Sequence, residues 1–174
     1  LVDLGPWLGS SSAALAEGLK RSGRSQKVQC FDLFRWEPSY MQAVAHENLA
    51  NGADFISLFR HETKAYATWI EAYKVDLLDY VWSGGPIEIL FVDAAKSWDL
   101  TNAILRGFGA HLVAGRSRIV LQDFRHQSVH WLALIFDTRR DLLREVEPVE
   151  DGWTVTFVPA KAILGLDGLI PRFS

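Results

Sequence analysis

The chain opens with Leu1-Val2-Asp3-Leu4-Gly5-Pro6-Trp7-Leu8-Gly9-Ser10-Ser11, and this stretch decides how the fold is interpreted. It joins a short apolar strand with an acidic residue, a turn with two glycines, and a helix that starts at Ser10. Such a turn lets the backbone come close to a ligand at the helix N-terminus. The stretch predicts a nucleotide-type cofactor site, although similar turns also simply cap helices.

Two later segments repeat the pattern of a strand followed by an acidic residue. The apolar run 87–92 ends at Asp93, with Lys96 three residues further on, and the run 117–121 leads to Asp123. The ends of parallel strands meet at one edge of a sheet, where ligands bind. We therefore expect these side chains to face one site.

Together these segments resemble the class I S-adenosylmethionine-dependent methyltransferases. Asp3-x-Gly5-x-x-x-Gly9-Ser10 is similar to the first motif of that superfamily as small-molecule O-methyltransferases carry it. Phe91-Val92-Asp93-Ala94-Ala95-Lys96 is similar to the Val-Asp-Ala-x-Lys stretch of the catechol and caffeoyl-coenzyme A O-methyltransferases. The resemblance covers nearly the whole chain. It implies an α/β, three-layer Rossmann-like fold with a mostly parallel seven-stranded sheet.

Periodicity agrees with an alternation of strands and helices. After the opening strand it predicts strands at 27–32, 54–59, 87–92 and 117–121, and helices at 10–19, 40–50, 63–81 and 100–112. Two further strands, 143–149 and 153–159, flank the turn signal Glu150-Asp151-Gly152 and predict a C-terminal antiparallel hairpin. Such a hairpin is typical of the methyltransferase fold and not of ordinary dinucleotide-binding domains.

Composition indicates a single domain over residues 1–174. The chain is 49% hydrophobic with a net charge of −3, and its scattered basic residues argue against nucleic acid as a partner. No apolar run approaches the ~20 residues that cross a membrane, so we expect a cytoplasmic protein. Seven tryptophans and ten phenylalanines leave apolar surface for a homodimer interface. Because the sequence begins without Met in a strand predicted to be central, we also expect N-terminal elements before Leu1.

The cofactor-binding candidates are the residues at the ends of the first, second and fourth predicted strands: Asp3, Gly5, Gly9, Ser10, Asp32 and Asp93. The two glycines would let the backbone pass close to the methionine part of S-adenosylmethionine. The Asp32 carboxylate can accept hydrogen bonds from both ribose hydroxyls, or serve as an ordinary turn residue. The resemblance adds that Asp3 anchors the turn near the cofactor's amino group. It also implies that His61 and Glu62 lie where adenine is contacted, although a plain solvated loop fits these two residues equally well.

One departure from the family pattern lies in the glycine turn. Trp7 stands where the superfamily often has a middle glycine, and Pro6 stiffens the loop. The indole could form a wall of the cofactor site or narrow it enough to exclude the cofactor.

The catalytic candidates are Lys96 and His126. Lys96 matches the catalytic lysine of the catechol-type enzymes, but a lysine acts as a base only if burial or a neighbouring cation lowers its pKa. A surface lysine and a structural ion pair are the alternatives. Because imidazole as a chemical group can exchange a proton near neutral pH, His126 could be the general base, or it could be an inert histidine at the start of a helix. If 122–131 is helical, His126 and His130 share one face near the mouth of the site.

A metal site is the other feature that the resemblance implies. In the metal-dependent relatives, an Asp after the fourth strand and an Asp-Asn pair after the fifth hold magnesium. Asp93 and Asp123 match, but Phe124 replaces the Asn. Two carboxylates could still hold a hydrated Mg²⁺, which keeps several waters.

Three classes of function follow. The first is an S-adenosylmethionine-dependent methyltransferase that acts on a small molecule, with O-methylation favoured by the resemblance. The second is a methyltransferase-like module that has lost catalysis and serves in binding or assembly, which the departures at Trp7 and Phe124 favour. The third is a nicotinamide-dependent oxidoreductase, which the glycine turn and Asp32 permit and the predicted hairpin disfavours.

Overall fold

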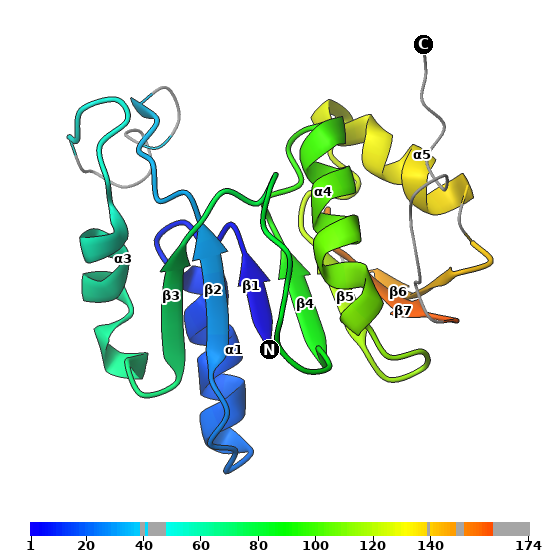
Figure 1. Cartoon of the computed structure of the whole chain (residues 1–174), viewed down its shortest axis with the longest axis horizontal. Coiled ribbons are helices and arrows are strands. Elements are labelled where there is room, and N and C mark those ends of the chain that lie inside the picture. Colours follow the sequence, from blue (N-terminus) through cyan, green and yellow to red (C-terminus); the bar gives the residue numbers. More distant parts are fainter. Residues whose placement is uncertain (39–40, 42–47, 139, 149–151, 162–174) are drawn as a thin grey trace.

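The computed structural model describes residues 1–38, 41, 48–138, 140–148 and 152–161. Seven strands form one sheet in the order β3-β2-β1-β4-β5-β7-β6. They are β1 (Val2–Leu4), β2 (Val28–Asp32), β3 (Ile70–Lys74), β4 (Ile89–Val92), β5 (Arg118–Leu121), β6 (Leu143–Pro148) and β7 (Val155–Pro159). β1 to β5 are parallel, whereas β7 runs antiparallel to both β5 and β6 (Figure 1). The predicted sheet and its C-terminal antiparallel pair are confirmed; residues 149–151 of the expected turn lie outside the described residues.

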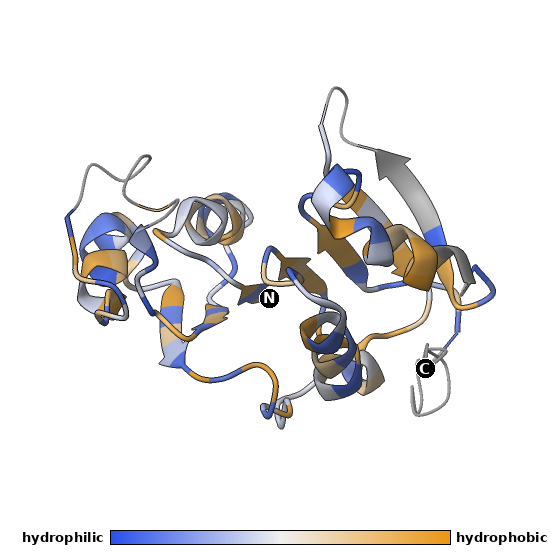
Figure 2. Ribbon diagram, turned by 90° about the horizontal axis from the view of Figure 1, so that it is seen from above, coloured by the Kyte–Doolittle hydropathy of each residue, from blue (hydrophilic) through white to orange (hydrophobic). Residues whose placement is uncertain are grey.

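Helices cover both faces of this sheet (Figures 1 and 2). They are the α-helices α1 (Ser10–Arg21), α3 (Ile56–Glu62), α4 (Trp98–Phe108) and α5 (His130–Thr138), with the short 3-10 helices η1 (Lys64–Tyr66), η2 (Gly109–His111) and η3 (Gln127–Val129). α4 lies in front of the sheet in Figure 1 and α1 lies behind it. None of the helices in the described part of the chain has the length and apolar character needed to cross a bilayer.

The alternation of side chains along the strands produces two apolar cores. Leu4 of β1 and Leu90 of β4 are buried with Phe108 of α4 in the larger core. Cys30 of β2 is buried with Phe59 of α3 in the other. Because central parallel strands are covered on both faces, each needs apolar residues on both sides.

The expected third strand at 54–59 is wrong, because this segment forms the start of α3. Phe55 and Phe59 are both buried and lie one helical turn apart. The Oδ1 atom of Asp54 accepts a hydrogen bond from the backbone N–H of Ile56 at 2.9 Å and so supports the helix start. A short apolar run such as 54–59 fits a strand or a helix equally well in the sequence, and the burial of both phenylalanines on one helical face decides for the helix.

The helix expected at 63–81 is also wrong, because the third strand lies within it. β3 pairs in parallel with β2, with Ala72 opposite Cys30. β3 is the edge strand, and four of its five residues are only partly buried, so its two faces do not contrast in the sequence. The helix expected at 40–50 falls mostly on 40 and 42–47, outside the described residues, and residues 48–50 belong to no helix.

Candidate functional site

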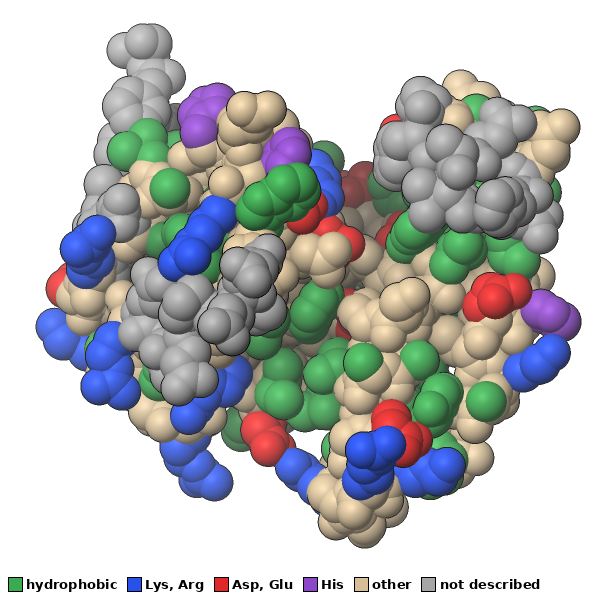
Figure 3. Space-filling model, turned by 180° about the vertical axis from the view of Figure 1, so that it is seen from behind, with side chains coloured by type: hydrophobic (Ala, Val, Ile, Leu, Met, Phe, Trp, Pro, Cys, Tyr) green, Lys and Arg blue, Asp and Glu red, His purple; other side chains and the backbone are tan. Residues whose placement is uncertain are grey.

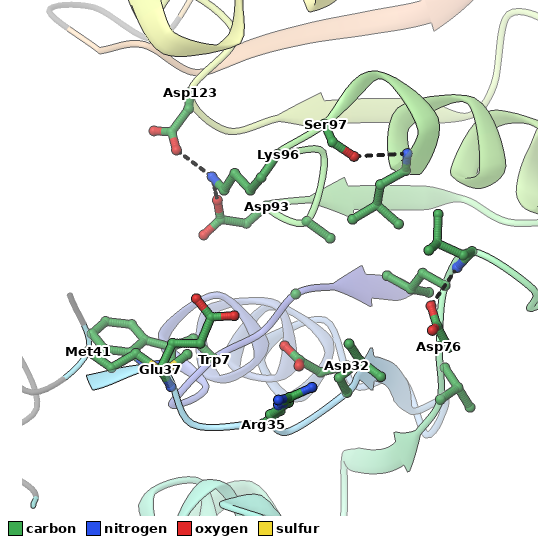
Figure 4. Close-up of a pocket in the computed structure, with 17 residues that line it drawn as sticks. Trp7, Asp32, Arg35, Glu37, Met41, Asp76, Asp93, Lys96, Ser97 and Asp123 are labelled. Carbon is green, nitrogen blue, oxygen red and sulfur yellow. Dashed lines mark hydrogen bonds and ion pairs between the residues drawn. The ribbon is translucent and has the colours of Figure 1, made fainter. Parts of the chain in front are cut away.

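A cavity of about 600 Å³ opens where the carboxyl ends of β1, β2, β4 and β5 meet. Figure 3 shows the surface hollowed between two lobes, with acidic side chains in the hollow. The charged residues of the wall are Asp32, Arg35, Glu37, Asp76, Asp93, Lys96 and Asp123 (Figure 4). Five carboxylates thus face two basic groups, and the cavity suits a ligand that carries positive charge.

Gly5 forms part of the cavity wall, and its position requires glycine. Its φ is +76°, and a Cβ atom there would lie 2.9 Å from the backbone nitrogen of Ala94. The N–H of Gly5 donates to the carbonyl of Phe31 at 3.0 Å, which ties the turn to β2. The turn therefore presents backbone to the cavity, as expected of a glycine at this place.

Gly9 and Ser10 are not among the residues that line the cavity, and their contact with the cofactor stays a prediction. A Cβ atom on Gly9 would lie 2.2 Å from Cγ2 of Thr63 and 3.1 Å from the ring of Phe59. Position 9 has room only for glycine, because α3 and Thr63, the residue that follows α3, pack against the start of α1. Ser10 is the exposed first residue of that helix.

Asp3 lies behind the turn and not on the cavity wall. It is fully buried, and its Oδ2 atom accepts hydrogen bonds from the hydroxyls of Ser11 at 2.8 Å and Ser12 at 2.6 Å. Its Oδ1 atom has no hydrogen-bond partner among the described residues. Burial raises the pKa of Asp3 to about 6, against the lowering effect of the two hydroxyls. Through its hydrogen bonds with the two serines, Asp3 links the first turn of α1 to β1.

Asp32 ends β2 and faces the cavity, where it was expected. Its carboxylate accepts a hydrogen bond from the backbone N–H of Phe34 at 2.7 Å. Burial raises the pKa of Asp32, while the N–H groups of Phe34, Trp7 and Leu33 act in the opposite direction. Backbone N–H groups thus fix the Asp32 carboxylate in place at the cavity wall.

Trp7 lines the cavity from the glycine turn (Figure 4). Its φ is +47°, a left-handed conformation that explains why glycine suits this position. The indole Nε1 atom is buried and has no hydrogen-bond partner among the described residues. Trp7 therefore forms part of the cavity wall, and its buried indole nitrogen is unpaired within the described ranges.

Lys96 lies between two carboxylates at the ends of β4 and β5 (Figure 4). Its ammonium nitrogen is 2.5 Å from Oδ1 of Asp93 and 2.5 Å from Oδ2 of Asp123. Burial lowers the pKa of Lys96, but the hydrogen bonds to Asp123 and Asp93 outweigh it and raise the pKa above its usual value. Lys96 is a cation at neutral pH, so the general-base role expected for it does not fit this geometry.

The magnesium ion that the resemblance implies does not fit the residues present. The ammonium of Lys96 already contacts both expected ligands, Asp93 and Asp123. The ring of Phe124, at the position of the third ligand, packs against the rings of Phe136 and Phe157, with centroids 5.7 and 5.1 Å away. Across the described ranges, no group of three or more His, Cys, Asp or Glu side chains could hold a metal ion.

His126 lies outside the cavity wall. Its Nδ1 atom accepts a hydrogen bond from the backbone N–H of Ser128 at 3.2 Å, which caps η3, and its ring contacts Trp153 with centroids 4.5 Å apart. His130 is the first residue of α5, whereas His126 comes before η3. The two histidines therefore do not share one helix, which differs from the arrangement expected for a helical 122–131 segment. The base role of His126 stays a prediction that this arrangement does not favour.

Comparison with known proteins places the sheet order and the antiparallel pair in a known fold. No family model matches the sequence, and no curated protein matches it. The O-methyltransferase NovP superimposes with a TM-score of 0.69 at 13% identity, over 92% of this chain and 72% of NovP. The chain has the class I methyltransferase fold. The N-methyltransferase NodS from Bradyrhizobium japonicum WM9, in complex with S-adenosyl-L-homocysteine, superimposes with a TM-score of 0.58 at 13% identity, over 92% of this chain and 77% of NodS. CalS11, a TDP-rhamnose 3'-O-methyltransferase of calicheamicin biosynthesis, superimposes with a TM-score of 0.59 at 12% sequence identity, over 91% of this chain and 70% of CalS11.

Sequence reasoning missed one wall of the cavity in this methyltransferase fold because it misplaced the third strand. The true β3 leads to Asp76, whose Oδ1 atom accepts a hydrogen bond from the N–H of Leu78 at 2.9 Å. Leu33 and Leu78, about half exposed, add apolar surface to the wall. His61 and Glu62, the expected adenine contacts, lie instead at the end of α3 and outside the wall. The run Ile70-Glu71-Ala72-Tyr73-Lys74 carries only a weak strand signal, from the β-favouring residues Ile70 and Tyr73.

Proposed function

We propose that this chain is an S-adenosylmethionine-dependent methyltransferase that acts on a small molecule. The observation that carries the proposal is the position of Asp32: a carboxylate on the cavity wall at the end of β2, beside the Gly5 turn, in a methyltransferase fold. A carboxylate there can accept hydrogen bonds from two vicinal hydroxyls of a ribose. NodS, which shares the fold, was solved with S-adenosyl-L-homocysteine bound.

The remaining wall matches the other parts of the cofactor. Leu33 and Leu78 offer apolar surface for a flat ring, and Asp76 offers a carboxylate beside them. The excess of carboxylates complements the sulfonium and ammonium charges of S-adenosylmethionine. Gly5 leaves room for the methionine part, while Asp3, behind the turn, would act only through the position of α1.

When bound, the cofactor supplies an electrophilic methyl group that is transferred in line to the acceptor atom. The protein must then hold the acceptor on the far side of the methyl group and exclude water. We propose a hydroxyl oxygen as that atom, because the Lys96 ammonium on the wall can donate a hydrogen bond to it. The neighbouring carboxylates of Asp93 and Asp123 can accept the hydroxyl proton as the oxygen–methyl bond forms and the sulfonium–methyl bond breaks. We propose that no magnesium ion binds between Asp93 and Asp123, since the Lys96 ammonium is ion-paired with both carboxylates.

Calorimetric titration with S-adenosyl-L-homocysteine tests the proposal, with Asp32→Asn as the variant and Asp79→Asn, an exposed residue outside the wall, as the matched control. We expect the Asp32 variant to lose roughly 10- to 100-fold in affinity, the effect of removing a charged hydrogen-bond acceptor, and the control to bind like the unmodified chain. Equal affinity of all three proteins would contradict the assignment of Asp32. Absence of binding by the folded, unmodified chain would favour the module without catalysis, and binding of NAD instead would favour the oxidoreductase.

A further inference from the structure

The ion pairs of Lys96 join two strands that are neighbours in the sheet but far apart in the sequence. Asp93 follows β4 and Asp123 follows β5, 27 residues from Lys96. The side chains of Asp93 and Asp123 are 26% and 31% exposed, and that of Lys96 is 49% exposed. All three residues line the same cavity. The ammonium is therefore a fixed positive charge at the cavity surface.

Two carboxylates this close together need a cation between them. Without one, they would repel each other in a partly desolvated site. In the metal-dependent relatives that the sequence resembles, the cation is magnesium with a third oxygen ligand. Here the corresponding residue, Phe124, is packed among aromatic rings and offers no oxygen. Lys96 supplies the missing charge from within the chain.

We propose that Lys96 is a built-in cation that takes the place of a divalent metal ion in this cavity. A metal ion could enter only by displacing the ammonium from both carboxylates, and it would then find two protein ligands where the relatives have three. Mg²⁺ is reluctant to give up its water and binds weakly to so few ligands. The relatives keep a third oxygen ligand beside a matching lysine, and Phe124 removes that ligand here. The site should therefore be closed to divalent ions while Lys96 contacts both remaining carboxylates.

The third N–H of the ammonium defines what this cation does. Lysine has three donors, and two of them are directed to Asp93 and Asp123. The remaining donor is available to the acceptor oxygen at the cavity surface. This part of the inference rests on the proposed methyltransferase function, whereas the exclusion of metal ions does not.

Titration with Mn²⁺, followed by the electron paramagnetic resonance signal of the free ion, tests the inference without any cofactor. We expect no binding to the unmodified chain up to millimolar Mn²⁺. Lys96→Met removes the ammonium at similar side-chain length, and should tighten Mn²⁺ binding at least about tenfold by leaving two adjacent carboxylates unpaired. Lys96→Arg keeps the charge and should not bind the ion.

A matched control comes from the exposed ion pair between Lys74 and Asp54, which also has a 2.5 Å contact. Lys74→Met frees a single carboxylate and should give no gain in Mn²⁺ affinity. The inference is overturned if the unmodified chain binds Mn²⁺ and Asp123→Asn abolishes that binding, or if folded Lys96→Met gains nothing. If Lys96→Met does not fold, the Mn²⁺ titration of the unmodified chain still tests whether the site excludes divalent ions. Failure to bind S-adenosyl-L-homocysteine, by contrast, would count against the proposed function and leave the metal result standing.

Discussion

A Cβ atom on Gly9 would lie 2.2 Å from Cγ2 of Thr63, so the start of α1 and the end of α3 approach each other as closely as a glycine allows. Thr63 is itself buried, and its hydroxyl donates to the carbonyl of Phe59 at 2.8 Å. The second glycine of the N-terminal turn is thus required by packing between helices. This contact positions the turn that carries Gly5 and Trp7.

Gly9→Ala should destabilise the protein through both this clash and the φ of +94° at Gly9. Gly23→Ala is the control, since Gly23 has a φ of +67° with nothing within 4 Å of its Cβ position. We expect a loss of about 1 kcal/mol in unfolding free energy for Gly23→Ala and about 3 kcal/mol for Gly9→Ala.

Denaturant unfolding measures both values. Thr63→Ser removes Cγ2 but keeps the hydroxyl, so in the Gly9→Ala background it should restore part of the loss. A double-mutant cycle with no coupling between the two positions would show that the clash is relieved elsewhere.

Asp3 should make stability depend on pH in a direction opposite to that of an ion-paired carboxylate. Its pKa is raised to about 6 by burial, so between about pH 4 and 6 the folded protein binds more protons than the unfolded chain. Stability from this group is therefore present at low pH and lost as pH rises through that window, by about 3 kcal/mol at most.

Melting temperatures of the unmodified protein and Asp3→Asn between pH 4 and 8 test this. The difference between the two should change in favour of the variant as pH rises and level off above about pH 7. A difference that does not vary with pH would mean that Asp3 titrates alike in both states. Carboxylates that do not interact with Asp3 contribute equally to both proteins and cancel in the difference, whereas Asp32 and Asp93 are electrostatically coupled to Asp3.

Leu78 should contribute to cofactor affinity through its apolar surface. Its side chain is 51% exposed on the cavity wall, and a bound ring would cover it. We expect Leu78→Ala to weaken S-adenosyl-L-homocysteine binding by about five- to tenfold, near 1 kcal/mol of lost burial. Val81→Ala is the control, because Val81 is 70% exposed but lies outside the wall. Calorimetry that found the two variants equally weakened would argue against a ring at Leu78.

The sequence predicts the part of the cavity wall at Asp32 better than the neighbouring part that follows β3. Asp32 follows a strand whose apolar pattern is strong because β2 is covered on both faces. Asp76 follows an edge strand whose partly buried residues, Ile70 and Tyr73 among them, also match helical spacing. Periodicity alone does not separate the two alternatives there, and the resemblance consequently implies adenine contacts at His61 and Glu62, just beyond the strand predicted at 54–59.

What the sequence by itself determined is local: the strand, glycine turn and helix of residues 2–21, the strand before Asp93, and the antiparallel pair at the C-terminus. These follow from side-chain periods and turn residues within a few positions of one another. Only the tertiary structure decided that Gly9 packs against Thr63, that Phe124 points into the core, and that Lys96 reaches Asp123. Such contacts depend on which elements become neighbours, here β4 beside β5, and local spacing carries no record of that. The charge of Lys96 was visible in the sequence, but its role was set by the two carboxylates that the sheet brings to it.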